Sequence, residues 1–268
     1  MARVLGSDMS NVHMEINYRE KEFPMTDQDF ERIARLAGRY TGIVLGKQKQ
    51  DMVYGRIARR LRKLNIHSFS AYLDYLEANV EKELSNFINV ITTNLTSFFR
   101  ENHHFEYLQK TVLPEIKRKN SDSKRIRIWS AGCSKGMEPY SIAMTLLKSG
   151  MPSNWDVKIL ATDLDSEVLD TASKAVYASS EVDGLEELVV KNYFQKSSDG
   201  KEVKVKDKVT KFVHFKRLNL LEKWPMSGPF DFIFCRNVVI YFDKPTQKVL
   251  FDRYADLLNV GGYLFVGH

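Results

Sequence analysis

The spacing of apolar residues changes near residue 125, and this change constrains the fold more than any other feature of the chain. From Thr26, apolar residues recur every three to four positions, as they do in amphipathic helices. After residue 125, short apolar runs alternate with helical patterns. Such an alternation is typical of a parallel α/β sheet. We therefore expect a small all-helical domain followed by a larger α/β domain.

The helical domain is expected over residues 26–91, as four amphipathic helices. Ser68 is the expected N-cap of the third helix, because a hydroxyl there can accept from a free backbone N–H. Residues 1–25 mix charges with little periodicity, so we expect a flexible tail. The apolar stripes of the four helices are Phe30, Ile33, Ala34 and Ala37, then Val53, Ile57, Leu61 and Leu64, then Tyr72, Leu73 and Leu76, and finally Leu84, Phe87, Ile88 and Ile91.

A linker is expected over residues 92–124, with one helix around Phe105 to Leu113. The α/β domain then covers residues 125–268. Its polar segment from about 193 to 212 contains a turn and the alternating residues Val203 and Val205, and is expected to form a small inserted β subdomain. Strands are expected at residues 126–131, 157–162, 213–218, 230–235 and 263–266, and helices at residues 138–147, 166–176 and 246–258.

The composition is that of an ordinary globular protein, with 43% hydrophobic and 28% charged residues. No segment approaches the roughly 20 consecutive apolar residues that a membrane span needs, so we expect a cytoplasmic protein without membrane insertion. Cys133 and Cys235 are too few for a disulfide framework or a four-ligand metal site, and both are expected to be buried thiols. The net charge of +6 and the pI of about 9.1 favour acidic partners, without choosing among nucleic acid, membrane and protein.

The strongest local motif is Ile128–Gly136, where a strand runs into a loop with two glycines and then into a helix. Glycines there let a ligand approach the backbone. Asp163 ends the next strand, somewhat beyond the spacing of roughly 20 residues at which an acid binds ribose hydroxyls. Together they indicate a nucleoside ligand. Simpler explanations are a tight turn for the loop, a helix cap for Asp163, and a favourable helix N-terminus for Glu138.

The glycine loop lacks the G-x-x-x-x-G-K-[ST] pattern, which disfavours a ligand gripped by its phosphates. S-adenosylmethionine is a nucleoside without phosphates. It carries a ribose diol, an adenine, a zwitterionic methionine end and a sulfonium. Binding these groups calls for a carboxylate, apolar walls and a few polar contacts. The loop and Asp163 suit this ligand.

Five blocks of sequence carry further information: TTNLTSFFRE at 92–101, SAGCS at 130–134 with EPYS at 138–141, ATD at 161–163, NL at 219–220 and FCRNVVIYF at 234–242. In this order, and over roughly residues 26–268, the chain resembles the CheR-type chemotaxis receptor O-methyltransferases. The resemblance implies a Rossmann-like, S-adenosylmethionine-dependent methyltransferase domain beside the helical domain. Met137 departs from the family pattern, where an acid is more usual. The chain ends just after the fifth expected strand, where a sheet of this type normally has two more.

The resemblance also implies an activity: a methyl group passes from S-adenosylmethionine to glutamate side chains of methyl-accepting chemotaxis receptors, giving methyl esters and S-adenosylhomocysteine without a metal. Arg100 and Tyr241 are the expected catalytic residues. The Arg100 guanidinium can hold a carboxylate in two bonds, either that of the substrate or that of the cofactor. Cofactor contacts are implied for Asn94, Thr96, Arg100, Glu138, Asp163, Asn219, Leu220, Arg236 and Asn237.

Partners follow from the same resemblance, because receptor methylation sites in this family lie on acidic helical surfaces. The expected docking site for the cytoplasmic helical region of a receptor is the basic face formed by Arg56, Arg59, Arg60, Arg62 and Lys63. A solvated helix face is the simpler alternative. The β subdomain resembles one that in some relatives binds a receptor C-terminal tail peptide by strand addition. The sequence leaves open whether this one does.

The expected chemistry needs no general base, because a glutamate with a pKa of about 4.3 is already ionised at pH 7. The main alternative is an RNA methyltransferase with a basic docking domain. Residues 56–63, however, lack the aromatic side chains that stack on bases. A non-catalytic adaptor that keeps the pocket as a sensor is the third possibility. The presence of Asn94, Arg100, Asp163 and Asn237 argues against it.

Overall fold

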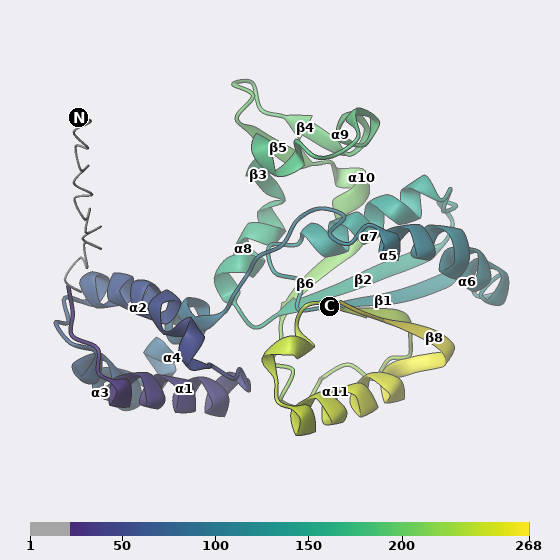
Figure 1. Ribbon diagram of the computed structural model, residues 1–268. Coiled ribbons are helices and arrows are strands. Elements are labelled where there is room, and N and C mark those ends of the chain that lie inside the picture. The colour runs from purple at the N-terminus through teal and green to yellow at the C-terminus, as the bar shows by residue number, and fades with distance from the viewer. Residues whose placement is uncertain (1–21, 268) are drawn as a thin grey trace, which may run out of the picture.

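The computed structural model describes residues 22–267 and shows a helical domain and an α/β domain joined by a linker (Figure 1). A flexible tail was expected over residues 1–25, and residues 1–21 of it lie outside the described residues. Phe23, near its end, is buried in the core of the helical domain, and its backbone N–H donates to Tyr54 Oη at 3.1 Å. The packed part of the helical domain therefore begins before Thr26.

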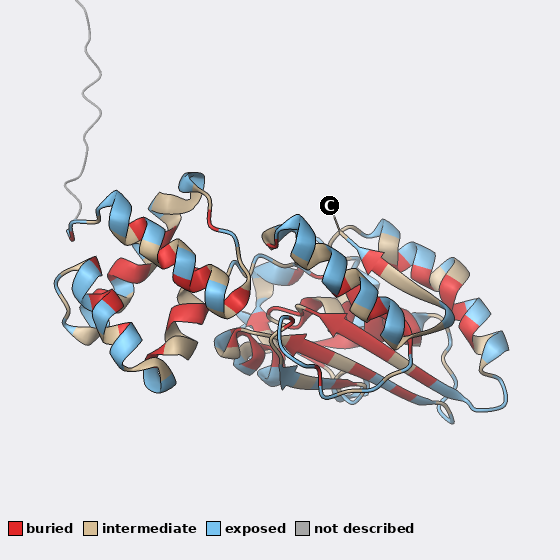
Figure 2. Ribbon diagram, turned by 90° about the horizontal axis from the view of Figure 1, so that it is seen from below, coloured by how far each residue is buried: buried red, intermediate tan, exposed pale blue. Residues whose placement is uncertain are grey.

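The helical domain is built from α1 (Asp27–Thr41), α2 (Gln50–Leu64), α3 (Phe69–Ala78) and α4 (Val80–Ile91), with a 3-10 turn, η1 (Lys47–Lys49), before α2. Thr26 and Asp29 form a capping box that starts α1. Ser68 caps α3 as predicted, accepting from the Ala71 N–H at 3.2 Å. Most residues of the predicted apolar stripes turn inward and form one core, which Figure 2 shows as red bands on the helices.

The linker continues as one helical stretch, α5 (His103–Tyr107), a π-helical turn η2 (Leu108–Val112) and α6 (Leu113–Lys119). This stretch is longer than the expected helix around residues 105–113. The extension is stabilised by burial, because Ile116 joins Leu108 and Leu113 in the core of the α/β domain. The helix therefore runs on until its apolar stripe ends.

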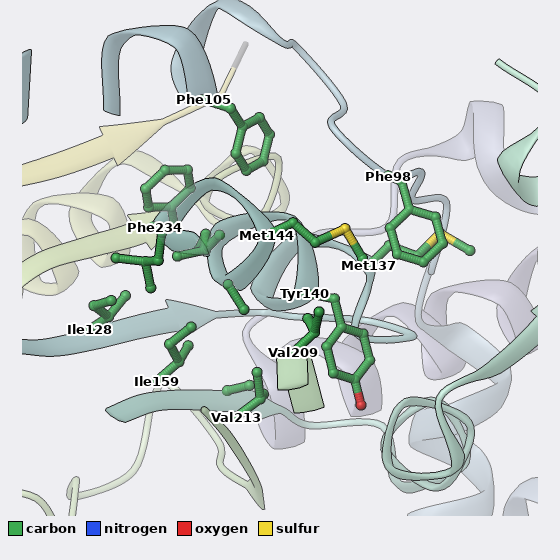
Figure 3. Close-up of a cluster of buried hydrophobic side chains, with 14 of the residues drawn as sticks. Phe98, Phe105, Ile128, Met137, Tyr140, Met144, Ile159, Val209, Val213 and Phe234 are labelled. Carbon is green, nitrogen blue, oxygen red and sulfur yellow. The ribbon is translucent and has the colours of Figure 1, made fainter. Parts of the chain in front are cut away.

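The large sheet is parallel, with strands in the order β6-β2-β1-β7-β8. Helices α5, α6 and α7 cover one face of it and α11 the other (Figure 1). Buried residues such as Ile128, Phe234 and Met144 fill the space between the sheet and α7 (Figure 3). The Rossmann-like α/β fold class is thus as predicted. The elements are β1 (Arg125–Ala131), α7 (Met137–Lys148), β2 (Asp156–Asp163), α8 (Ser166–Lys174), β6 (Val213–Arg217), β7 (Phe230–Cys235), η4 (Val239–Tyr241), α11 (Lys244–Leu257) and β8 (Leu258–Val266).

The insert forms an antiparallel sheet in the order β3-β5-β4, and it begins earlier than the expected residue 193. Val176 was expected at the end of a helix. Ala175, however, adopts a left-handed backbone with φ of 56°, which ends α8, and Val176 then pairs with Lys204. A three-residue strand offers little periodicity to read in the sequence. The elements are β3 (Val176–Ala178), η3 (Ser179–Val182), α9 (Glu187–Tyr193), β4 (Phe194–Lys196), β5 (Glu202–Val205) and α10 (Asp207–Thr210).

Candidate functional site

A cleft lies at the carboxyl ends of β1, β2 and β7, closed on one side by the linker and the helical domain. The order of strands reverses between β1 and β7, and ligands of open α/β sheets bind at such a reversal. Thr41, Ile43 and Lys49 line the cleft from the helical domain. It is also lined by every residue predicted to bind the cofactor or to take part in catalysis: Asn94, Thr96, Arg100, Glu138, Asp163, Asn219, Leu220, Arg236, Asn237 and Tyr241.

The glycine loop between β1 and α7 is held closely against its surroundings. Gly132 and Gly136 have φ of 82° and 84°, a region that favours glycine. A Cβ on Gly132 would lie 2.3 Å from Val238 Cγ2, and one on Gly136 would lie 2.8 Å from Ala172 Cβ. Close packing therefore explains both glycines. The parts of the loop that a ligand in the cleft could contact include Gly132 and Ser134, which line the cleft.

Asp163 presents a fixed carboxylate at the end of β2. It accepts from the Ser134 N–H at 2.7 Å and from the Asp165 N–H at 3.0 Å. Burial raises the pKa of Asp163, and these backbone hydrogen bonds oppose the rise. The simpler explanation of Asp163 as a helix cap is wrong, because the N-cap of α8 is Asp165, which accepts from Glu167 and Val168. Asp163 is therefore available to a ligand in the cleft.

Arg236 is the centre of a buried charge network at the wall of the cleft. Its side chain is only 2% exposed, and it pairs with Glu138 at 3.1 Å and with Glu101 at 3.2 Å. Burial raises the pKa of Glu138 despite the pairing with Arg236. The pKa of Glu101, in contrast, is lowered. Partial burial acts to raise it, but hydrogen bonds from Asn237 and Arg236 outweigh the effect of burial. The negative charges of two neighbouring carboxylates are therefore compensated by one guanidinium.

The start of the linker is fastened to both domains. On the helical side, Arg56 donates to the carbonyls of Val90 and Thr92. On the sheet side, Asp165 accepts from Thr92 Oγ1 at 2.8 Å and from Asn94 Nδ2 at 2.6 Å. Asp165 was not predicted. Its position before a helix is a recognisable N-cap signal, but its contact with Asn94 depends on the fold. Because the Asn94 amide is used in this way, Asn94 shapes the cleft by holding the linker.

Two further predicted residues connect the domains. Asn219 Nδ2 donates to the Tyr40 carbonyl at 3.0 Å. The carbonyl of Tyr241 accepts from the Val44 N–H at 2.9 Å, and Lys49 Nζ lies 4.8 Å from the centre of the Tyr241 ring. The cleft is therefore assembled by both domains. Arg100 lies on its wall, and its Nη1 donates to the Leu95 carbonyl at 2.9 Å.

The structure corrects the predicted basic docking face on α2. Arg56 is half-buried on the linker, and Arg60 pairs with Glu83, whose side chain is 1% exposed and also accepts from Tyr72 Oη. These two arginines have internal structural roles, because Arg56 holds the backbone at the start of the linker and Arg60 holds the buried Glu83. Arg59, Arg62 and Lys63 are exposed, and Arg62 pairs with Glu22 at 3.2 Å.

Comparison with known proteins establishes the family. Residues 28–92 match the CheR methyltransferase all-alpha domain, and residues 94–268 match the CheR methyltransferase SAM binding domain. The chain belongs to the CheR methyltransferase family. The chemotaxis protein methyltransferase of Salmonella typhimurium is 43% identical over 274 residues, covering 100% of this chain and 91% of that protein. The chemotaxis protein methyltransferase of Escherichia coli is 44% identical over 250 residues, covering 91% of this chain and 84% of that protein.

Membership of the CheR family confirms the resemblance drawn from the five sequence blocks, and with it an S-adenosylmethionine-dependent methyltransferase. Each predicted cofactor residue falls within the matched SAM binding domain, which begins at Asn94. Cys133 and Cys235 are buried free thiols, as predicted. Among residues 22–267, the helices are too short or too polar to cross a membrane.

Proposed function

We propose that this CheR methyltransferase transfers the methyl group of S-adenosylmethionine to glutamate side chains of methyl-accepting chemotaxis receptors, forming methyl esters and S-adenosylhomocysteine. The observation that carries the proposal is the convergence of Asp163, Arg100 and Tyr241, from separate parts of the chain, on one cleft. The names of the relatives supply the chemotaxis context. The protein would act in the cytoplasm, on the cytoplasmic helical region of a receptor.

Methyl transfer to a carboxylate depends on alignment. S-adenosylmethionine supplies a methyl group on a sulfonium, with a neutral thioether as the leaving group. Asp163 would accept from the ribose hydroxyls, and Arg100 would hold a carboxylate in line with the methyl group. The other proposed contacts to the cofactor come from Asn94, Thr96, Glu138, Asn219, Leu220, Arg236 and Asn237.

The proposal is tested by incubating the protein with methyl-labelled S-adenosylmethionine and either a receptor cytoplasmic fragment or RNA. Label should pass to the receptor fragment and be released by mild alkali, because methyl esters hydrolyse readily. Alkali-stable label on RNA would support the alternative RNA methyltransferase. Absence of label from both would contradict catalysis on either substrate.

Arg100→Lys should lower the rate of methyl transfer by at least about tenfold, or roughly 1.4 kcal/mol of transition-state stabilisation. Lysine keeps the charge, but its compact ammonium cannot reproduce two parallel bonds to a carboxylate. The measurement is kcat/KM for the receptor fragment. Arg118→Lys, at an exposed arginine on α6, is the matched control and should retain full activity. Full activity of Arg100→Lys with an unchanged melting temperature would show that the orienting group lies elsewhere.

Reversing the charge of Arg59 and Lys63 together should raise the KM for the receptor fragment by about tenfold at low salt, where surface charges are least screened. Both side chains are exposed on α2. Arg60 is left intact, because its loss would leave Glu83 buried without a counterion. A control with the same change in net charge is Arg118→Glu with Lys148→Glu, both exposed on the α/β domain. Equal KM values for the two double variants would exclude docking on α2.

The insert supports a second proposed contact, with a receptor C-terminal tail peptide. In the order β3-β5-β4, strands β3 and β4 are edges of the small sheet. An extended peptide can add to such an edge through backbone hydrogen bonds. Titration of the protein with a tail peptide, followed by amide exchange at β3 and β4, would detect the addition.

Methyl transfer should be unchanged by EDTA, because the proposed reaction uses no metal. The side chains of Glu101, His103 and His104 do come within 4.8 Å of one another. Glu101 is paired with Arg236, however, and a fixed cation beside a carboxylate opposes binding of a second cation. The measurement compares initial rates before and after dialysis against EDTA. A loss of activity that zinc or another divalent ion restores would contradict the metal-free reaction.

A further inference from the structure

The mouth of the cleft is edged by exposed aliphatic side chains. Val44, Leu95 and Ile240, which we term the apolar rim, are 55%, 78% and 51% exposed. They come from three separate segments: the loop after α1, the linker and η4. Leu95 and Ile240 line the cleft, and the hydrogen bond from Val44 to the carbonyl of Tyr241 places Val44 beside η4. Two residues of the rim therefore line the same cleft as Arg100 and Tyr241, and the third lies next to η4.

The apolar rim brings together exposed aliphatic side chains from separate parts of the chain. Single exposed aliphatic residues are common on protein surfaces. Their gathering from separate segments around one opening is typical of an interaction site. Lys49, whose ammonium lies over the Tyr241 ring, adds a positive charge at the same place. The opening thus combines apolar contacts with attraction for a carboxylate.

We propose that the apolar rim binds the apolar side chains that flank the acceptor glutamate on a receptor helix. This inference rests on the proposed function. A glutamate carboxylate extends only roughly 5 Å from its helix backbone, so the helix must lie across the mouth of the cleft for the carboxylate to reach Arg100. Residues three and four positions away lie about 5–6 Å from the glutamate on the same face. Those neighbours would therefore lie against the rim.

The charges around the rim fit the same occupant. An amphipathic receptor helix with acidic residues beside its apolar stripe would meet Lys49 at the mouth and the exposed Arg59 and Lys63 on α2. Glutamates with apolar neighbours at three and four positions are thereby preferred as acceptors over glutamates with charged neighbours.

The test uses Leu95→Ser with Ile240→Ser, assayed with a receptor cytoplasmic fragment. The KM for the fragment should rise by about tenfold, because part of the apolar contact is lost. The kcat should change less than about twofold, since contacts made equally in the ground and transition states alter only KM. Val260→Ser with Val249→Ser, at exposed valines on β8 and α11, is the matched control and should leave both constants unchanged. An unchanged KM in the rim variant, or a loss confined to affinity for S-adenosylmethionine, would overturn the proposal.

A reciprocal change on the substrate sharpens the test. Serine in place of the apolar residues three and four positions from the acceptor glutamate should raise the KM of the wild-type protein. The same substrate change should have little further effect in the rim variant, because contacting residues are not additive. Full additivity would overturn the proposal. If the proposed function itself fails, the wild-type protein forms no alkali-labile ester on any fragment; if only the rim proposal fails, esters form and the rim variants behave as wild type.

Discussion

Arg236→Met should lower the free energy of unfolding by about 3–5 kcal/mol, because removing one partner of a buried ion pair leaves the other charge uncompensated. Arg236 is 2% exposed, and its partners Glu138 and Glu101 are 12% and 19% exposed. Methionine fills a similar volume, so the loss would come from the missing charge and hydrogen bonds. Urea unfolding at pH 8 is the measurement.

A matched control is Arg32→Met, because Arg32 also pairs with two carboxylates, Asp74 and Glu77, but at the surface. Exposed pairs contribute about 0–1 kcal/mol. The effect of Arg236→Met should also depend on pH. Without Arg236, the already raised pKa of Glu138 rises further. A folded-state pKa above the unfolded value costs stability as pH rises through it, so the deficit should be larger at pH 8 than at pH 5. A loss no greater than that of Arg32→Met at both pH values would contradict a buried charge network.

Much of the fold was predictable, because it depends on local periodicity. Phe30, Ile33 and Ala37 lie one turn apart in the sequence and are buried together in α1. Every residue of β7 is buried, as expected for a central parallel strand that reads as a continuous apolar run. The site residues were predictable for another reason. They fall in sequence blocks shared with a family, and the structure brings those blocks to one cleft.

What the sequence could not show is which partner each polar side chain takes. Arg59 and Arg60 are adjacent, yet Arg59 is exposed while Arg60 binds the buried Glu83 on α4. That pairing depends on how α2 packs against α4, which periodicity does not report. The contact of Asp165 with Asn94 joins residues 71 positions apart in the chain. The role of Asp165 in holding the linker is therefore visible only in the folded protein.

Asp163→Ala should weaken binding of both S-adenosylmethionine and S-adenosylhomocysteine by about 100-fold. Asp163 lines the cleft with a carboxylate held by backbone N–H groups. Two hydrogen bonds from the ribose hydroxyls to this charged acceptor would together contribute roughly 3 kcal/mol. Calorimetric titration with each ligand is the measurement. Asp170→Ala, at an exposed acid on α8, is the control and should bind both ligands as wild type.

The comparison between the two ligands separates a ribose contact from other roles of Asp163. Both carry the same ribose, and they differ only in the methyl group and the charge on sulfur. If Asp163 binds the ribose, its loss weakens both ligands by the same factor; if it acts through the positive charge of the sulfonium, S-adenosylmethionine loses more. Asp163→Asn keeps the shape and an oxygen acceptor for the Ser134 N–H, so it should keep the loop in place while weakening the ribose contact. Unchanged affinity of Asp163→Ala for both ligands, with an unchanged melting temperature, would remove Asp163 from the cofactor site.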